Sequence, residues 1–357
     1  MKVVIVGGVA GGAGCAARLR RLDENAEIIM LERGEYISYA NCGLPYYVGG
    51  VITDKKALQV QTVAGFRSRF RVDVRTESEV ISVDTQKKTV QVRHGGETYE
   101  ESYDKLVLSP GASPVKPPIP GMEENHVFTL RNIPDTYAIY DFIEENKPKT
   151  CVVVGAGFIG LEMAENLSER GLAVTVVEGA SHVMPPIDMD MAHQVHNYIR
   201  AKGLNLYLGQ TCTAMDKDGV ILGNGQKIPA DMVLLSIGVR PDTAFLKDSG
   251  IEMGARGEIL VNEYMETSAA DVYALGDAVS TFHVVSGAKV VIPLASPANK
   301  QGRIVGDNLS GRRTAYKGSQ GTSIMKFFDM TVAVTGEKEE SLKAQGRAYR
   351  KAITTSA

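Results

Sequence analysis

The sequence has few cysteines, no surplus of either charge and no long apolar run. Its four cysteines lie far apart and form neither a CxxC pair nor a Cys/His cluster, which argues against a zinc site and a disulfide scaffold. A net charge of −3 over 357 residues gives no general attraction to nucleic acid or anionic membranes. No segment approaches the ~20 apolar residues of a membrane-spanning helix. We therefore predict a cytoplasmic protein with no metal, nucleic-acid or membrane partner.

What the sequence does have is apolar material for two or three cores, at 44% hydrophobic residues, and two glycine-rich turns. The first turn follows the β-branched segment Lys2–Val6, precedes a helical pattern, and is followed by a second strand pattern that ends at Glu32. Tight glycines and a helix N-terminus bind a pyrophosphate, and the acidic residue binds a ribose, so this unit predicts a dinucleotide site. Val9 stands where such turns have their middle glycine, which weakens the motif taken alone.

The second turn, in TCVVVGAGFIGLEMAENL, has all three glycines of the GxGxxG pattern and lies about 150 residues beyond the first. Its second strand ends at Glu178, which is followed by Gly179 and Ala180 rather than arginine. A carboxylate repels the 2′-phosphate of NADPH, so we predict that this site prefers NADH. His182 is the only nearby group that could soften the preference. One such match could be an unrelated strand-to-helix turn, but two matches make that reading improbable.

Three further segments carry a family resemblance: TSAADVYALGD (residues 267–277), LVLSPGASP (106–114) and LLSIGVRPD (234–242). With the two glycine turns, they make the chain resemble the pyridine nucleotide-disulfide oxidoreductases, flavoproteins that pass a hydride from a nicotinamide through FAD to a thiol or disulfide. The first segment is similar to the second FAD motif of that family, in which the final aspartate, here Asp277, binds the ribityl chain. Alone, this aspartate could simply cap a helix.

The resemblance covers nearly the whole chain and implies an α/β fold with two Rossmann-like domains. The FAD-binding domain would comprise residues 1–112 and 241–315, split by an NAD(P)-binding domain at 113–240. Residues 316–357 would begin a C-terminal α+β dimerisation domain, with two strands in IMKFFDMTVAVTG, a helix in EKEESLKAQ and a strand in AYRKAITTSA. The family form is a homodimer. Because most of that last domain is missing, we expect a truncated chain whose own dimerisation is doubtful.

The resemblance also implies which residues bind FAD and NAD(P)H. Glu162 is expected near the nicotinamide pocket. The full set comprises the turn residues Gly7, Gly8, Val9, Ala10, Gly11 and Gly12, then Glu32, Arg33, Val80, Ser109, Gly111 and Arg131, then Gly155, Gly157, Phe158, Ile159, Gly160, Glu162, Glu178 and Gly238, and finally Gly276, Asp277, Leu294 and Ala295.

One cysteine, Cys42 in SYANCGLPYY, is predicted to be the working thiol. We place it at the start of a helix, where the helix N-terminus would lower the pKa of the thiol and favour the reactive thiolate. For the other three cysteines, Cys15, Cys151 and Cys212, we predict a buried, inert position. Two-cysteine members of the family carry CxxxxC, whereas this chain has Tyr47 at the second position. The oxidised form would therefore be a sulfenic acid or a mixed disulfide.

The Cys42 segment resembles the coenzyme A-disulfide reductase branch, in which the single cysteine forms a mixed disulfide with CoA and some members act on persulfides or polysulfides. Peroxidases of the family carry a histidine in the first glycine loop, where this chain has Ala10. Ser38 and Asn41 flank the thiol and are expected to act with it. The resemblance further implies CoA contacts by Arg18, Arg21, Arg67, Arg71 and Asn299, although solvated helix faces explain single arginines as well.

Two alternatives stay open from the sequence. One is an NADH oxidase or peroxidase that uses a Cys42 sulfenic acid, with Ala10 as the feature against it. The other is a non-catalytic redox sensor that binds flavin and NAD. The favoured mechanism begins with hydride transfer from NADH to FAD and ends with reduction of the Cys42 mixed disulfide.

Overall fold

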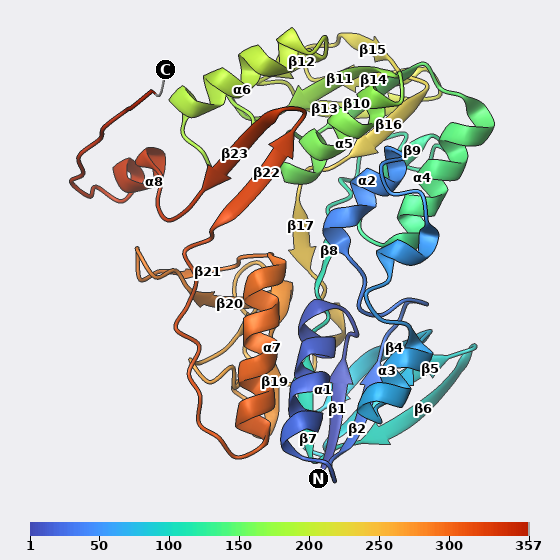
Figure 1. Ribbon diagram of the computed structural model, residues 1–357, viewed down its shortest axis with the longest axis vertical. Helices are drawn as coiled ribbons and strands as arrows, with labels where there is room; N and C mark the ends of the chain where they lie inside the picture. The colour runs from blue at the N-terminus through green and yellow to red at the C-terminus, as the bar shows by residue number, and fades with distance from the viewer. Residues whose placement is uncertain (356–357) are drawn as a thin grey trace.

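A computed structural model describes residues 1–355 and shows two α/β lobes, one above the other in Figure 1. The lower lobe is built on a parallel five-stranded sheet in the order β19-β7-β1-β2-β3. These strands are β1 (Lys2–Val6), β2 (Glu27–Leu31), β3 (Asp73–Arg75), β7 (Lys105–Leu108) and β19 (Val272–Ala274). Strand β1 is buried on both faces, which explains its unbroken β-branched sequence.

The upper lobe repeats this plan with a second parallel sheet in the order β12-β11-β10-β16-β9. Its strands are β9 (Val127–Thr129), β10 (Thr150–Val154), β11 (Ala173–Glu178), β12 (Asn205–Leu208) and β16 (Met232–Leu235). The chain passes from the first sheet into the second and returns to add β19 to the first. The predicted fold class, a Rossmann-like unit split by another, is therefore confirmed.

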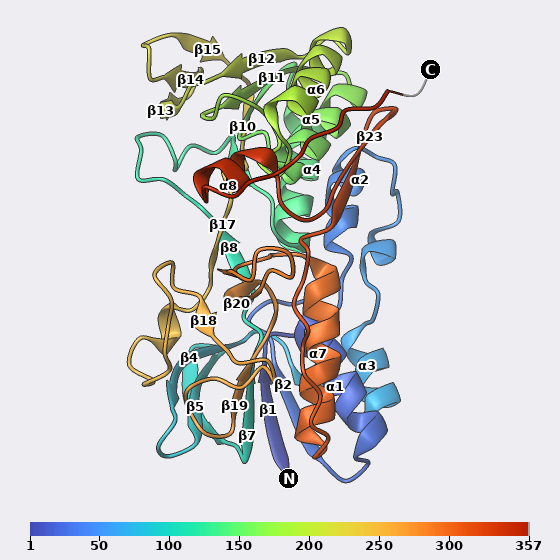
Figure 2. The same ribbon diagram turned by 90° about the vertical axis from the view of Figure 1, so that its left-hand side faces the viewer.

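Helices cover both sheets. Their bounds are α1 (Ala10–Leu22), α2 (Leu44–Val48), α3 (Val63–Phe70), α4 (Ile133–Asn146), α5 (Phe158–Glu169), α6 (Met189–Ala201), α7 (Ala295–Leu309) and α8 (Glu339–Ala344). Helices α1 and α7 lie side by side in both ribbon views (Figures 1 and 2). A Cβ atom added at Gly302 of α7 would lie 2.4 Å from the carbonyl oxygen of Gly11, so the two backbones are in direct contact. Within the described residues, none of these helices has both the length and the apolar character to cross a bilayer.

Smaller sheets and short 3-10 turns complete the two lobes. The strands are β4 (Ser78–Asp84), β5 (Thr89–His94), β6 (Glu97–Ser102), β8 (Ala112–Pro114), β13 (Cys212–Asp216), β14 (Gly219–Leu222), β15 (Lys227–Pro229), β17 (Val239–Pro241), β18 (Ile259–Leu260), β20 (Val279–Phe282) and β21 (Lys289–Val290); the 3-10 turns are η1 (Asn41–Gly43), η2 (Lys55–Leu58), η3 (Ala244–Leu246) and η4 (Gly276–Ala278). The two segments that run between the lobes, β8 and β17, pair antiparallel with each other. The lobes are therefore joined by a two-stranded connection rather than by two independent linkers.

The C-terminal segment forms the hairpin β22 (Ser323–Phe327) and β23 (Met330–Val334), followed by α8. Both strands and the helix agree with the sequence-based prediction. The hairpin buries Met325 and Phe327 in the apolar core of the upper lobe. The strand predicted in AYRKAITTSA is wrong for residues 348–355, which have no regular structure; its last two residues lie outside the described part of the chain. This segment finds no neighbouring strand to pair with among residues 1–355, and a lone strand leaves its backbone groups without partners.

Candidate functional site

The first glycine turn begins where β1 ends and is shaped by two close backbone contacts. Gly7 has a φ of +95°, and a Cβ atom there would lie 2.0 Å from the carbonyl oxygen of Ser109. A Cβ atom at Gly12 would lie 1.9 Å from the carbonyl oxygen of Gly7. Only glycine fits these two positions. Val9, in contrast, is the residue just before α1 and has a negative φ, so the turn accepts its side chain.

Glu32 directly follows β2, and its carboxylate is hydrogen-bonded to the backbone of this turn. The N–H of Gly8 donates to its Oε2 (2.7 Å), and the N–H of Gly34 donates to its Oε1 (2.9 Å). Burial raises the pKa of the Glu32 carboxyl above its ordinary value, and these two donors act in the opposite direction. The carboxylate is thus fixed beside the glycine turn, where each oxygen keeps a second lone pair for a ligand hydroxyl.

Predicted cofactor residues from distant segments meet at this edge of the sheet. Val6, Leu108 and Ala274 end three adjacent strands in register, so Gly7, Ser109 and the segment around Gly276 follow them at one place. Nη2 of Arg131 pairs with Oδ2 of Asp277 at 2.9 Å. A Cβ atom at Gly111 would lie 3.4 Å from Nη2 of Arg131, which adds Gly111 to the group.

Four further predicted residues belong to other segments of the chain. Leu294 precedes the first residue of α7, Ala295, and a Cβ atom at Gly276 would lie 3.9 Å from the Cβ of Ala298 in the first turn of this helix. Arg33 pairs with Asp242. Val80 lies on β4 and is 6% exposed in the lower core, so only its backbone can contribute to a ligand.

The second glycine turn repeats the first one. Gly155 has a φ of +102°, and a Cβ atom at Gly160 would lie 2.0 Å from its carbonyl oxygen. Glu178 accepts from the N–H of Ala156 (2.7 Å) and from the N–H of Ala180 (2.8 Å). Phe158 and Ile159 start α5 directly after the turn, while Gly238 follows β16 with a φ of +112°.

His182 was the one nearby group expected to favour a 2′-phosphate. In the structure its ring nitrogens already contact other residues. It is 5% exposed; its Nδ1 lies 2.8 Å from the carbonyl oxygen of Val183, and its Nε2 lies 3.3 Å from a carboxylate oxygen of Glu340. Both ring nitrogens therefore have partners within the protein.

Cys42 is exposed and lies in the 3-10 turn η1 (Asn41–Gly43), which runs directly into α2. The loop before it is tied to the first glycine turn, because the N–H of Ser38 donates to the carbonyl oxygen of Gly8 at 3.0 Å. Ser38 has a φ of +45°, and its carbonyl oxygen accepts from the N–H of Val60 (2.8 Å). The loop that leads to Cys42 is thus tied to the first turn at Ser38, four residues before the cysteine.

The predicted low pKa of this thiol is wrong for the structure. The cysteine is exposed but still partly surrounded by protein: this partial burial, and then the charge of Glu162, raise the pKa of Cys42, and only a backbone hydrogen bond opposes them. The helix that follows is five residues long, too short to offset these two effects. The sequence could not show this, because Glu162 lies on α5 of the other lobe.

Tyr47 stands at the position of the second redox cysteine of two-cysteine relatives and is packed among aromatic rings. It is 4% exposed, and its ring lies 5.6 Å from that of Tyr137 and 5.2 Å from that of Tyr140, centre to centre. Cys15 and Cys151 are buried, as predicted, and burial raises the pKa of both thiols. Cys212 is only half-buried, which corrects the prediction of a core position.

The predicted substrate residues fall into two groups that the fold does not bring together. Ser38 is hydrogen-bonded to Gly8 just before α1, and Asn41 directly precedes Cys42. Arg21 and Arg71 lie near the other end of α1, roughly 17 Å away along the helix axis. Arg18 pairs with Asp307 at 2.7 Å, and Arg67 donates to the carbonyl oxygen of Val74. Asn299 lies over α1, with its Oδ1 3.5 Å from where a Cβ of Gly14 would be.

Sequence reasoning missed three residues at the site: Gln301, Glu165 and Lys326. The Oε1 atom of Gln301 accepts from the N–H of Gly276 (2.7 Å), which fixes the segment before Asp277. Glu165 is 5% exposed and lies 3.5 Å from Nζ of Lys326. Its spacing of three from Glu162 on a helix was the available signal.

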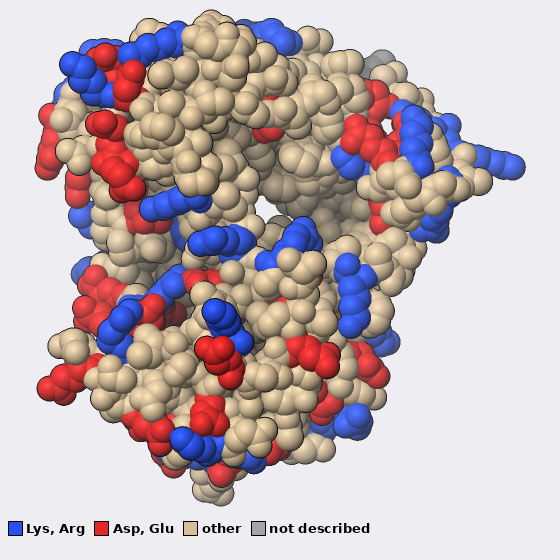
Figure 3. Space-filling view, turned by 180° about the vertical axis from the view of Figure 1, so that it is seen from behind, with Lys and Arg blue, Asp and Glu red and all other residues tan. Residues whose placement is uncertain are grey.

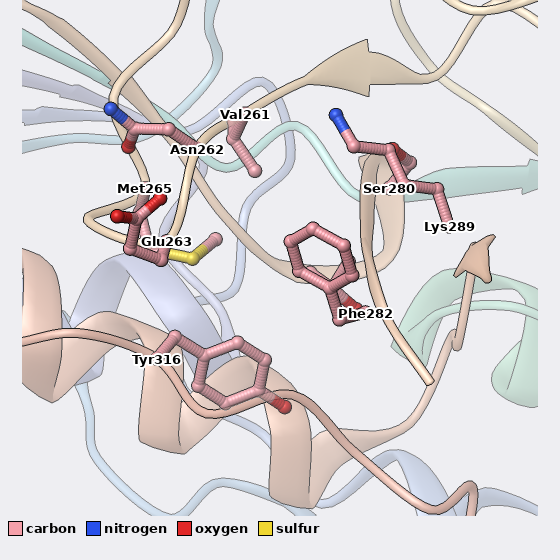
Figure 4. Close-up of a pocket in the computed structure, with 9 residues that line it drawn as sticks. Val261, Asn262, Glu263, Met265, Ser280, Phe282, Lys289 and Tyr316 are labelled. Carbon is pink, nitrogen blue, oxygen red and sulfur yellow. The ribbon is translucent and has the colours of Figure 1, made fainter. Parts of the chain in front are cut away.

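A small cavity of the lower lobe lies apart from these residues (Figure 4). It is lined by Val261, Met265, Ser280, Phe282 and Tyr316, among others, and none of the predicted site residues lines it. On the face seen in Figure 3, acidic and basic side chains are interspersed, and Lys and Arg side chains border the hollow between the lobes.

Comparison with known proteins places the chain in a family. Residues 1–302 match the family described as pyridine nucleotide-disulphide oxidoreductase. The chain belongs to this family. Membership implies binding of FAD and a pyridine nucleotide. Both glycine turns have features that fit a dinucleotide, because each has close backbone contacts and a carboxylate held by backbone donors. The predicted family and its oxidoreductase class are confirmed.

Three proteins similar to this chain bear on its activity. The coenzyme A disulfide reductase of Staphylococcus aureus is 37% identical over 96% of this chain and 78% of its own length. The crystal structure of reduced Bacillus anthracis CoADR-RHD is 50% identical with a TM-score of 0.96, over 98% of this chain and 64% of that one. An NAD-dependent persulfide reductase from A. fulgidus is 39% identical with a TM-score of 0.94, over 97% of this chain and 66% of that one. The family member described here thus spans just under two thirds of each of the latter two chains.

Proposed function

We propose that the chain is an oxidoreductase that passes electrons from NADH through FAD and the thiol of Cys42 to a disulfide or persulfide of coenzyme A. The observation that carries this proposal is the position of Cys42. Its exposed thiol lies in a loop tied to the first glycine turn, and the second cysteine position holds a buried tyrosine. A lone thiol of this kind can form a disulfide only with a sulfur from outside its own loop. The names of the relatives support CoA or a persulfide as that partner.

The two turns would hold the two nucleotides. Residues 1–112 and 241–315 would bind FAD through the first turn, Glu32 and Asp277, and residues 113–240 would bind the nicotinamide nucleotide through the second. FAD, when bound, supplies the chemistry of taking a hydride and passing an electron pair to sulfur. Glu178 favours NADH, because its carboxylate is fixed by two backbone donors and no cation among the described residues pairs with it.

The protein's own contribution is to orient and exchange sulfur. The thiolate of Cys42 attacks one sulfur of the substrate, a new S–S bond forms, and the other sulfur leaves as a thiol. Reduction of the resulting mixed disulfide releases the second thiol and restores the thiolate. Ser38 and Asn41 would orient the substrate at the thiol, and Arg21 and Arg71 would meet a phosphate at the far end of a long ligand.

Anaerobic stopped-flow spectroscopy tests this function. The purified protein is reduced with NADH while the flavin spectrum is followed, and then mixed with CoA disulfide, CoA persulfide, peroxide or oxygen. We expect rapid reoxidation by a CoA-linked substrate, lost in Cys42→Ser and kept in the matched control Cys212→Ser. Reoxidation by peroxide or oxygen alone would replace the proposal with an NADH oxidase or peroxidase. Reduction by NADH with no reoxidation by any acceptor would favour the redox sensor.

A further inference from the structure

Helix α2, which directly follows the turn of Cys42, is packed into the upper lobe, although the strands before and after it, β2 and β3, belong to the lower lobe. Leu44, Tyr47 and Val48 are buried in the apolar core of the upper lobe. Figure 1 shows α2 there, next to α4 and α5. The ring of Tyr47 lies 5.2 Å from that of Tyr140 of α4, centre to centre. The upper lobe therefore supports the helix that follows the thiol.

The turn of Cys42 is bonded into the same unit as this helix. The N–H of Gly43 donates to the carbonyl oxygen of Ala40 (2.8 Å), and the N–H of Ala40 donates to that of Leu58 (2.8 Å). Leu58 is fully buried in the apolar core of the upper lobe, and a Cβ atom at Gly43 would lie 3.3 Å from one of its methyl carbons. We therefore expect the turn and α2 to move together.

The other side of the cysteine is tied to the lower lobe. The N–H of Ser38 donates to the carbonyl oxygen of Gly8 in the first glycine turn. Ser38 lies four residues before Cys42, and Val48, at the end of α2, lies six residues after it. Cys42 thus lies between two anchors, one on each lobe. A change at the upper anchor would move the thiol relative to the first glycine turn.

Arg170, the residue that follows α5, holds the end of α2. Its Nη1 donates to the carbonyl oxygen of Val48 (2.9 Å), one of the carbonyl groups for which a helix end offers no intrahelical donor. Its Nη2 pairs with Glu144 of α4, and its guanidinium carbon lies 4.9 Å from the centre of the Tyr140 ring. One side chain therefore joins α2, α4 and α5.

We propose that Arg170 is a positioning residue for the thiol of Cys42: by fixing α2 to the upper lobe, it sets where the thiol lies relative to the first glycine turn. The inference rests on the function proposed above and adds a residue to it. Arginine suits this role because its planar group donates to two acceptors while stacking on a ring. The contact has no spare room beside it, since a Cβ atom at Gly49 would lie 2.0 Å from Oδ1 of Asn166.

Separate measurement of the two half-reactions tests this role. The purified holoprotein is reduced anaerobically with NADH while the flavin spectrum is followed, and is then mixed with saturating CoA disulfide. Arg170→Gln should leave the rate of flavin reduction within about twofold and slow the limiting rate of reoxidation about tenfold or more, because a small displacement of reacting groups costs large factors in rate. A general loss of stability would not divide the two half-reactions in this way.

A matched control and an independent pair of variants support the test. Glu144→Gln breaks the ion pair but leaves the bond from Arg170 to Val48, so it should change neither rate. Gly49→Ala forces a methyl group against Asn166 and should slow reoxidation, whereas the double variant with Asn166→Ala removes the two nearest atoms and should restore most of the rate. Equal slowing of both half-reactions, unchanged reoxidation in Arg170→Gln and Gly49→Ala, or no recovery in the double variant would overturn the proposal.

Amide hydrogen exchange separates this inference from the proposed function, because it needs no electron acceptor. In Arg170→Gln, peptides from residues 40–52 should exchange several-fold faster, while peptides from the two glycine turns keep their wild-type rates. This pattern, found in a protein that reduces no CoA-linked substrate, would support the anchoring by Arg170 and overturn only the substrate. Turnover of CoA disulfide with wild-type exchange at residues 40–52 in the variant would overturn the inference and leave the function in place.

Discussion

The two glycine turns of this chain have the same backbone conformation, but the helices that follow them differ in sequence. Gly7 and Gly155 have nearly the same positive φ. Gly12 and Gly160, each the third residue of its helix, approach the carbonyl oxygens of Gly7 and Gly155 respectively. Each turn is closed by a glutamate that accepts two backbone N–H donors. Two residues past the last glycine, however, α1 has Gly14 where α5 has Glu162.

This difference separates the residues that shape the turn in both units from the residues that distinguish one unit from the other. The small residues of α1 let α7 approach until Gly302 meets the backbone of Gly11, so this helix is covered by the protein itself. Helix α5 has carboxyl groups at the corresponding positions, Glu162 and Glu165, and packs against α2, the helix that follows Cys42. The glycines therefore fix the backbone of each turn. The residues of the following helical turn determine whether the helix packs closely against another helix, as α1 does, or carries carboxyl groups, as α5 does.

The largest expected effect breaks the shared backbone. Gly12→Ala and Gly160→Ala would each place a methyl group about 2 Å from a carbonyl oxygen, and we expect each to lower the free energy of unfolding by about 3 kcal/mol. Gly157→Ala is the matched control. Its Cβ would meet nothing within 4 Å, and the first turn already carries Val9 there. Urea unfolding measures all three. Equal losses in Gly157→Ala and Gly160→Ala would refute the assignment of scaffold positions.

The next effect sharpens the difference between the helices through pH. Glu162 has a folded pKa of about 7, above the ordinary value of 4.5, so the folded state holds an extra proton between these values. The stability it contributes is present at low pH and is lost as pH rises through about 7. Allowing for partial exposure, wild type should lose about 2 kcal/mol between pH 5 and pH 8 relative to Glu162→Gln. Urea unfolding at both pH values measures this, with Glu169→Gln as the control. Parallel losses in wild type and Glu162→Gln would contradict it.

A third effect separates the two glutamates that close the turns. Glu178→Gln keeps a side-chain acceptor but removes the charge that opposes a 2′-phosphate, so the ratio of kcat/KM for NADH over NADPH should fall about tenfold, or about 1.4 kcal/mol. Glu32→Gln should leave this ratio unchanged and weaken retention of the flavin instead. The test measures kcat/KM with NADH and with NADPH in both variants, together with their flavin content. A change of specificity in Glu32→Gln would reverse the assignment of the two sites.

The features that the sequence predicted are those that the backbone imposes locally. Both strand-turn-helix units, the C-terminal hairpin and the buried positions of Cys15 and Cys151 follow from glycine spacing and apolar runs. The raised pKa of Cys42 was not predictable, because it depends first on burial and then on the charge of Glu162, a residue 120 positions away in the chain, and both effects arise from tertiary packing. The prediction of a strand at residues 348–355 was wrong for a related reason: a strand needs a neighbouring strand to pair with, and the local sequence pattern does not supply one.

The smallest expected effect concerns the basic side chains of α1. Arg18 donates to Asp307 through Nε (2.8 Å) and pairs through Nη2 (2.7 Å), so its charge is already matched by α7. Arg18→Gln should lower the free energy of unfolding by less than about 1 kcal/mol, since the pair is partly exposed. It should also change the KM for CoA disulfide little. Arg21 has no ion pair among the described residues, and its loss in Arg21→Gln should raise that KM several-fold. A double-mutant cycle of Arg18→Gln with Asp307→Asn measures the coupling directly. If Arg18→Gln raises the KM as much as Arg21→Gln does, the arginine leaves Asp307 to bind substrate, and α1 is less completely covered than its comparison with α5 implies.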